Sequence, residues 1–387
     1  MNLEEILKIM VEQKASDLHI RALRPPLLRI KGELHPLDNA KAFTPQELDS
    51  IAESLMNETQ KKKFNEEQSI DIAYSIPGLT RFRVNIFRQR GTTSIVFRNI
   101  SLHIPSIEEM GLPTVLNTFC DKPQGLVLVT GPTGSGKSTT LATLVRRVNE
   151  TRNVHIITIE DPIEFLFIDE KATISQREVG IDTPSFGLAL KNALRQDPDL
   201  ILLGEMRDLE TISTVMMASD TGHLVFSTLH TNNAIQTINR IIDVFPAEQQ
   251  DQVRIQLANV LIGIISQRLV PRKDGKGRIA AVEVLINSPR IKSLILENKI
   301  DEITEEMEKS VRYYRMQTLE LSLIALIANK MITLEAALSA SIRPDDLKLM
   351  LSQLGFDEEG NYIPPDREQT LVSEKPEKGN DDMLSYM

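Results

Sequence analysis

Residues Gly125 to Thr140 read Gly-Leu-Val-Leu-Val-Thr-Gly-Pro-Thr-Gly-Ser-Gly-Lys-Ser-Thr-Thr, and the prediction of the fold rests first on this segment. Leu126–Thr130 is a short apolar run typical of a buried strand, and Thr139–Val148 has the pattern of a helix. Between them lies a complete phosphate-loop motif, formed by Gly131, Pro132, Thr133, Gly134, Ser135, Gly136, Lys137 and Ser138. Eight matching residues between a strand and a helix are much more specific than a glycine-rich turn that happens to precede Lys-Ser.

Each part of this motif suits a bound polyphosphate. The glycines let backbone N–H groups turn toward the phosphates, and the helix that follows directs its positive end at the same anion. Lys137 is expected to reach the β- and γ-phosphates, and the Ser138 hydroxyl is expected to ligate Mg²⁺. With Thr139 as a further binding residue, the sequence predicts a site for ATP and Mg²⁺.

Composition narrows the class of protein. The 387 residues are 41% hydrophobic, enough for two domains and a tail. The net charge of −10 argues against a general nucleic-acid binder, although it leaves room for a local basic patch. Cys120 is the one cysteine, so an internal disulfide and a cysteine-based zinc cluster are excluded and a reducing cytoplasm is expected.

The N-terminus, Met-Asn-Leu-Glu-Glu-Ile, has neither the basic region nor the apolar core of a signal peptide. No apolar run approaches the roughly 20 residues that span a bilayer. We therefore expect no direct membrane insertion, and any membrane association would depend on a partner.

The first hundred residues have the pattern of a mixed, mostly antiparallel α/β domain. Leu3–Gln13 has helical spacing, and Thr44-Pro45-Gln46-Glu47 has the pattern of a capped helix start. Short apolar runs predict strands at Asp17–Ile20, Leu27–Gly32, Ile70–Ser75, Arg81–Arg88 and Thr93–Arg98. His19 and His35 are isolated, and nothing in the pattern gives them a role.

Beyond a Pro- and Gly-containing linker, the pattern changes to alternating strands and helices. Strands are predicted at 126–130, 154–160, 199–204 and 223–228, with helices at 137–149, 184–195 and 208–219. This order predicts a largely parallel sheet covered on both faces, with ligands beyond the carboxyl ends of its strands. Amphipathic helical runs follow at Glu248–Arg268, Ile291–Leu296, Thr318–Ala328 and Leu334–Ala340, before a polar tail that we expect to be disordered.

Two predicted strands end in carboxylates that could complete the site. Glu160 follows Ile156–Ile159, and Glu205 follows Leu200–Gly204, where Gly204 stands at the position that usually carries Asp. Glu205 is the candidate to orient or deprotonate the attacking water, and Glu160 is the candidate for the Mg²⁺ side. The alternative is that both carboxylates only cap helices.

A third strand is bracketed by His223 and His230. Either histidine alone would more often be a packing residue. Because Gly222, Thr228 and Asn232 surround them at strand ends, we interpret the pair as a sensor of the γ-phosphate.

Four segments together, GPTGSGKS, ITIEDPIE, LILLGEMRD and TGHLVFSTLHTN, resemble the secretion ATPase superfamily of type II secretion and type IV pili. Within it the chain resembles the PilT/PilU pilus retraction ATPases, whose pattern is followed by Arg81–Asn85, Ile264–Leu269 and Met316–Thr318. The chain lacks the four-cysteine zinc motif and the long N-terminal extra domain of many extension ATPases.

The resemblance implies an α/β fold with a small PAS-like N-terminal domain and a RecA-like P-loop ATPase domain. The expected division is 1–100 for the PAS-like domain, 101–117 for the linker, 118–290 for the ATPase core, 291–355 for a helical C-terminal portion and 356–387 for a disordered tail. It also implies a homohexamer that acts at the cytoplasmic face of the inner membrane through a pilus platform protein.

Some segments depart from the main retraction type. Arg290–Lys299 keeps only the shape of its signature, and Asp274–Arg278, Val282–Asn287, Pro344–Met350 and the tail look closer to PilU, the accessory member. A paralogous retraction ATPase is therefore an expected partner.

By the same resemblance, Arg83 and Arg98 approach the nucleotide phosphates, with Arg195, Arg207 and Arg268 as further candidates. From the residues alone they would pass for solvated charges. The expected function is a hexameric ATPase motor for pilus retraction. Rival hypotheses are a pilus extension or type II secretion ATPase, a non-hydrolysing nucleotide-gated scaffold, and a nucleic-acid translocase disfavoured by the charge.

Overall fold

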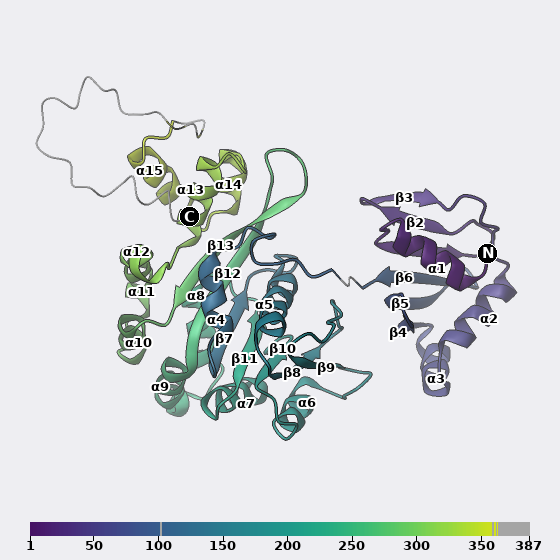
Figure 1. Cartoon of the computed structure of the whole chain (residues 1–387), viewed down its shortest axis with the longest axis horizontal. Coiled ribbons are helices and arrows are strands. Elements are labelled where there is room, and N and C mark those ends of the chain that lie inside the picture. The colour runs from purple at the N-terminus through teal and green to yellow at the C-terminus, as the bar shows by residue number, and fades with distance from the viewer. Residues whose placement is uncertain (101–102, 358–359, 361, 363–387) are drawn as a thin grey trace, which may run out of the picture. The chain divides into compact units, whose positions relative to one another are not determined.

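The computed structural model describes residues 1–100, 103–357, 360 and 362. The chain forms two compact units, drawn in Figure 1. The first comprises the described residues of Met1–His103 and Glu164–Leu166, and the second comprises the described residues of Ile104–Ile163 and Phe167–Met387. Among the described residues, no helix is both long and apolar enough to cross a membrane.

The N-terminal unit is built on an antiparallel sheet of six strands in the order β3-β2-β1-β6-β5-β4. Its strands are β1 Asp17–Arg21, β2 Leu27–Ile30, β3 Glu33–Pro36, β4 Ser69–Ile76, β5 Thr80–Gln89 and β6 Thr92–Asn99. Its helices are α1 Leu3–Glu12, α2 Pro45–Leu55 and α3 Glu58–Glu67. The predicted antiparallel α/β arrangement is confirmed.

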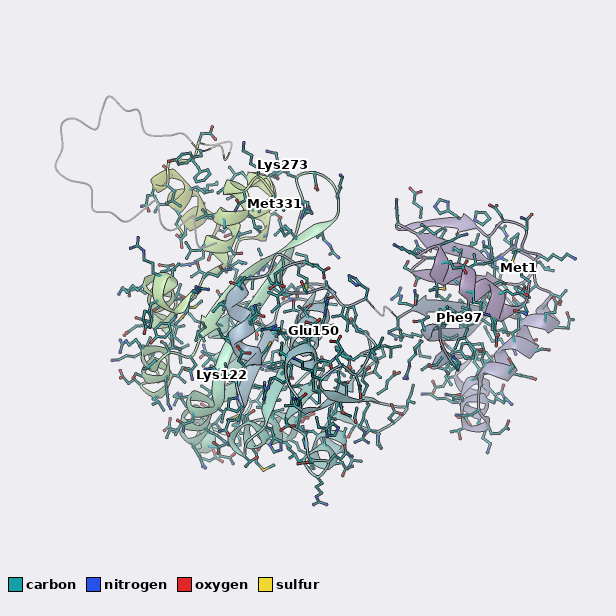
Figure 2. All side chains as sticks on the ribbon, in the orientation of Figure 1. Met1, Phe97, Lys122, Glu150, Lys273 and Met331 are labelled. Atoms are coloured by element: carbon teal, nitrogen blue, oxygen red, sulfur yellow. The ribbon has the colours of Figure 1, made fainter. Side chains whose placement is uncertain are left out.

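Buried side chains alternate with more exposed ones along β4, β5 and β6, and the buried ones contribute to the core of this unit. Phe82 and Phe97 come from neighbouring strands and meet edge to face at 6.2 Å between ring centroids (Figure 2 labels Phe97). The capping box predicted for α2 is present, because the Thr44 side chain accepts from the Glu47 N–H and the Glu47 carboxylate accepts from the Thr44 N–H.

The second unit contains a sheet of seven strands in the order β13-β12-β7-β11-β10-β8-β9. These are β7 Gly125–Thr130, β8 His155–Glu160, β9 Thr173–Glu178, β10 Leu200–Leu203, β11 Leu224–Leu229, β12 Leu261–Pro271 and β13 Arg278–Ile286. Every pair is parallel except β12 with β13. The carboxyl ends of β7, β11, β10 and β8 therefore meet at one edge, where the candidate site lies.

Helices cover both faces of this sheet, as predicted. Leu126 and Leu128 face a core shared with α6, α7, α8, α9 and α10, whereas Val127 and Val129 face one shared with α4 and α5. The helices are α4 Asn117–Cys120, α5 Lys137–Thr151, α6 Phe186–Ala193, α7 Leu209–Asp220, α8 Ala234–Asp243, α9 Gln250–Val260, α10 Pro289–Leu296, α11 Ile303–Lys309, α12 Val311–Tyr314, α13 Leu319–Ala328, α14 Leu334–Ala340 and α15 Pro344–Gln353. Short 3₁₀ turns lie at η1 Thr114–Leu116, η2 Ala247–Gln249 and η3 Ile300–Glu302.

The helical run predicted for Glu248–Arg268 is wrong in its second half. The helix α9 ends at Val260, and Leu261 begins β12. This apolar segment is buried between two partners, because β12 pairs with β7 on one side and with β13 on the other. Tertiary pairing therefore outweighs the helix-like spacing of its apolar residues.

Two expected boundaries differ from the structure. Most of the proposed linker 101–117 packs on the second unit, where Ile104, Ile107, Leu112 and Leu116 are buried. Phe356, the first residue of the expected tail 356–387, is buried, and its ring meets that of Tyr362. Residues 101–102 and most of the predicted tail, including 363–387, lie outside the described residues.

Candidate active site

The phosphate loop connects the end of β7 to the start of α5. Gly134 and Gly136 have φ of 76° and 91°, a backbone region that glycine adopts without strain. A side chain at Gly131 would place its Cβ 2.4 Å from the Gln267 carbonyl oxygen. The loop thus requires these glycines for its conformation and its close packing.

Lys137 is the first residue of α5, and its side chain is buried at 9% exposure. Its ammonium donates to the carbonyl oxygens of Gly131 at 2.9 Å and Pro132 at 3.1 Å. These bonds place the positive charge against the loop, close to the positive end of α5. The arrangement suits the binding of a polyphosphate.

Ser138 and Thr139 occupy the first turn of α5, and Ser138 is exposed. Within the described residues, no group of three or more His, Cys, Asp or Glu side chains is suited to hold a metal. Mg²⁺ in nucleotide sites is usually held by phosphates, waters and one or two protein oxygens, not by a protein cage. The exposed Ser138 hydroxyl fits that requirement.

Glu205 follows the end of β10 and is 15% exposed. One carboxylate oxygen lies 3.2 Å from Nε2 of His230, and the other forms an ion pair with Arg207. Because β11 lies between β7 and β10, His230 at its end stands between Glu205 and the phosphate loop. The structure therefore brings Lys137, Glu205 and His230 to one edge of the sheet.

The electrostatic surroundings of His230 favour its neutral form. Partial burial, followed by the charges of Lys137 and Arg207, lowers the pKa of His230 below its ordinary value. A neutral imidazole carries one N–H donor, so His230 can donate to the Glu205 carboxylate or to a bound phosphate, but not to both at once.

Glu160 ends β8, one strand beyond β10 in the sheet. Its Oε1 accepts from Thr158 Oγ1 at 2.6 Å and from Gln176 Nε2 at 3.4 Å. Glu160 thus lies at the same edge as Glu205, held by the neighbouring strand β9. Its assignment to the Mg²⁺ side stays a prediction.

The structure does not bring His223 to His230, the histidine with which it was expected to form a sensor of the γ-phosphate. His223 precedes β11 and lies beside Gly125, at the amino ends of the parallel strands, where its Nδ1 lies 3.0 Å from the Ala218 carbonyl oxygen. The six residues of β11 separate it from His230 by roughly 20 Å. Neighbouring motif residues at opposite ends of a strand cannot share one site.

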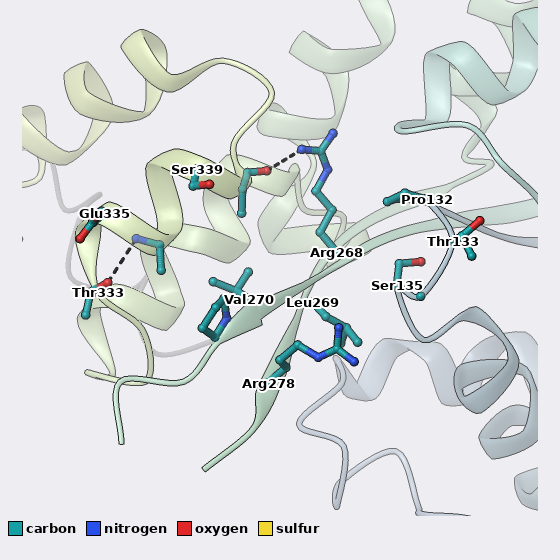
Figure 3. Close-up of a pocket in the computed structure, with 14 residues that line it drawn as sticks. Pro132, Thr133, Ser135, Arg268, Leu269, Val270, Arg278, Thr333, Glu335 and Ser339 are labelled. Carbon is teal, nitrogen blue, oxygen red and sulfur yellow. Dashed lines mark hydrogen bonds between the residues drawn. The ribbon is translucent and has the colours of Figure 1, made fainter. Parts of the chain in front are cut away.

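Arg268 lies on β12 beside the phosphate loop. With Pro132, Thr133, Gly134 and Ser135, it lines a cavity of ≈ 550 Å³ that extends to α14 (Figure 3). Its Nη1 donates to the Ala340 carbonyl oxygen at 2.9 Å. Its role as a nucleotide-binding residue stays a prediction.

Arg83 and Arg98 belong to the N-terminal unit. They face each other across β5 and β6, and each is near a carboxylate of that unit. Arg98 Nε donates to Asp17 at 2.8 Å, and Arg83 Nε lies 3.6 Å from Asp71. Their role toward the nucleotide stays a prediction.

Gln267 is a residue at the site to which the sequence analysis gave no role. It contacts the phosphate loop although 132 positions separate it from Ser135. The segment Ile264–Leu269 had a family pattern, but no local rule connects a strand residue to a loop so distant in sequence.

Comparisons with known proteins agree with this geometry. Residues 1–337 match the family model described as type II/IV secretion system protein. The type IV pilus retraction ATPase PilT of Pseudomonas aeruginosa is 44% identical over 89% of this chain and 100% of the relative. The type IV pilus ATPase PilU of the same organism is 40% identical over 94% of both chains.

Among solved structures, the pilus retraction motor PilT with bound ADP aligns with a TM-score of 0.83 and 46% identity. The alignment covers 90% of this chain and all of that structure. The chain therefore belongs to the type II/IV secretion system protein family, and within it to the ATP-hydrolysing secretion ATPases of the PilT/PilU type.

Proposed function

We propose that this chain is the subunit of a homohexameric motor that uses Mg-ATP hydrolysis to retract a type IV pilus. The observation that carries the proposal is the meeting of Lys137, Glu205 and His230 at the carboxyl edge of the sheet. Similarity over 89% of the chain to a relative named as a pilus retraction ATPase supports the direction of the work.

The chemistry follows from the positions of the side chains. Lys137 and the loop N–H groups neutralise charge on the phosphates as the terminal phosphoryl group is transferred. Glu205 orients the attacking water and accepts its proton, and Arg207 and His230 fix the direction of the carboxylate. Mg²⁺, held in part by Ser138 with Glu160 on the same side, would add positive charge at the phosphates.

The remaining assignments concern charge and domain organisation. Arg83 and Arg98 are proposed to supply positive charge to the transition state, with Arg268 as a binding residue beside the loop. The N-terminal domain, ATPase core and helical C-terminal portion would form one motor subunit, in which closure over the nucleotide becomes mechanical work.

The proposed partners are a platform protein of the inner membrane and a paralogous retraction ATPase, and the proposed location is the cytoplasmic face of that membrane. Nucleic acid is not a proposed partner. The match to PilU spans 94% of both chains, which favours an accessory member as the second candidate. These two roles differ in whether the chain drives retraction alone.

Twitching motility in deletion strains tests the proposal. A strain without this chain should spread less on a surface while still displaying pili, and the wild-type gene should restore spreading. Repeating the assay without the paralogue separates a main motor from an accessory one. Loss of surface pili in the deletion strain would instead indicate an extension ATPase, and full rescue by a variant without ATP turnover would indicate a scaffold.

A further inference from the structure

The carboxamide of Gln267 connects the phosphate loop to the first turn of α5. Gln267 lies on β12 with 1% exposure. Its Nε2 donates to the Ser135 carbonyl oxygen at 2.6 Å, and its Oε1 accepts from the Thr140 hydroxyl at 2.8 Å. One side chain therefore fixes both the loop and the first turns of α5.

The chemistry of these contacts allows only one orientation. The Ser135 carbonyl can only accept, and the amide nitrogen of Gln267 can only donate. The site is buried, so a lost partner would leave a polar group without water to replace it. Glutamine thus matches both neighbours, whereas glutamate or an apolar residue of similar size does not.

The loop also packs directly on this residue. A Cβ at Gly131 would lie 2.4 Å from the Gln267 carbonyl oxygen, and a Cβ at Gly136 would lie 3.0 Å from its Nε2. Glycines near the beginning and the end of the loop thus leave the space that Gln267 fills. The backbone of the loop packs against Gln267, and the Gln267 side chain donates a hydrogen bond to the Ser135 carbonyl oxygen.

We propose that Gln267 is a positioning residue for ATP hydrolysis, which holds the phosphate loop in the conformation that binds the phosphates. It acts through the loop backbone and Lys137, not by reaching the nucleotide. The loop binds phosphates in both the ground state and the transition state. Loss of the Gln267 side chain should therefore weaken the binding of ADP and ATP alike. The inference rests on the proposed role of the loop in Mg-ATP binding and hydrolysis.

Substitution of Gln267 with methionine tests the binding effect. Met keeps the volume but removes both hydrogen bonds, so Gln267→Met should raise the Kd for Mg-ADP and the KM for ATP about tenfold, with a smaller change in kcat. Gln317 is the matched control, because its Nε2 also donates at 2.6 Å to a backbone carbonyl, that of Val282, among residues that do not line the nucleotide site. Gln317→Met should leave both constants near wild type.

Substitution with glutamate adds a pH readout that a merely structural role would not produce. In Gln267→Glu, an ionised carboxylate cannot donate to Ser135, but a protonated one can. The affinity of this variant for Mg-ADP, relative to wild type, should therefore rise as the pH falls from 8 to 6. Gln317→Glu should show no such change in nucleotide affinity.

The outcomes are distinct. Wild-type Kd and KM in a folded Gln267→Met, or equal losses in the Gln267 and Gln317 variants, would overturn the proposal. If Gln267→Met does not fold, Thr140→Val removes one of the two hydrogen bonds at nearly constant volume. An unchanged Kd of Thr140→Val for Mg-ADP would also overturn the proposal. ADP affinity is measured without turnover, so a wild-type protein that binds nucleotide but does not hydrolyse it would refute the proposed function alone.

Discussion

At the scale of single residues, Glu205 has the most direct part in the proposed reaction. Its carboxylate is held between His230 and Arg207 at the end of β10. Gln has nearly the same shape but cannot accept a proton, so Glu205→Gln should lower kcat at least ~100-fold while ATP affinity is retained.

Steady-state ATPase assays together with nucleotide titrations measure the two effects separately. Glu210→Gln is the control, because Glu210 is an exposed neighbour that pairs with Lys191. Equal turnover in the Glu205 and Glu210 variants would transfer the role of base to Glu160 or to no carboxylate.

We also predict that the buried Glu283 makes the folding stability depend on pH. It accepts from the Ala234 N–H at 2.6 Å, and burial raises the pKa of Glu283 from 4.5 to about 7, with Glu320 adding to the shift and Arg343 opposing it. The folded state thus keeps a proton that the unfolded state has lost. The contribution of Glu283 to the free energy of unfolding is fully present below about pH 4.5. It falls by roughly 3 kcal/mol as the pH rises to about 7.

Glu283→Gln has no titratable group at position 283. Its free energy of unfolding, relative to wild type, should therefore increase between pH 5 and pH 8. Urea unfolding at both pH values measures this difference, with the exposed Glu248→Gln as the control. Parallel pH dependence of wild type and Glu283→Gln would show that Glu283 titrates at the same pH in both states.

The sequence predicted those site residues that belong to local motifs. Lys137, Ser138, Glu205 and His230 each follow a buried strand, and the parallel sheet then brings those strand ends together. The histidine pair was misjudged because strand direction places His223 at the far edge. Gln267 could not be found, because its partners are set only by the pairing of β12 with β7.

At the scale of elements, the alternating pattern predicted β7, α5, β8, α6, β10, α7 and β11, each to within a few residues. The strands β12 and β13 were missed, because an apolar strand buried on both faces has no period that separates it from a helix. The sheet has three strands besides the four that were predicted, with β12 and β13 at one edge and β9 at the other, and β12 carries both Gln267 and Arg268.

The end of the helical C-terminal portion gives an element-scale prediction. Phe356 is 7% exposed and packs in the cluster formed by α13, α14 and α15. Phe356→Ala should lower the free energy of unfolding by roughly 3 kcal/mol, since a buried aromatic ring is lost. Thermal unfolding measures the change, and Tyr313→Ala, at 84% exposure, should have little effect. Unaltered stability in Phe356→Ala would mean that the C-terminal portion ends before this residue.

At the scale of the whole molecule, the proposal requires an assembly. Mass photometry of the purified protein with Mg-ADP should give a main species of six times the 43.6 kDa chain mass. A monomer at every protein concentration and in every nucleotide state would contradict a ring motor.

The retraction speed of fluorescently labelled pili in living cells tests whether ATP hydrolysis by this chain drives retraction. In a strain that lacks this chain, we expect the wild-type gene and Glu210→Gln to restore retraction, and Glu205→Gln to leave the pili extended. Retraction at wild-type speed with Glu205→Gln, when the purified variant has no ATP turnover, would show that hydrolysis by this chain does not drive retraction.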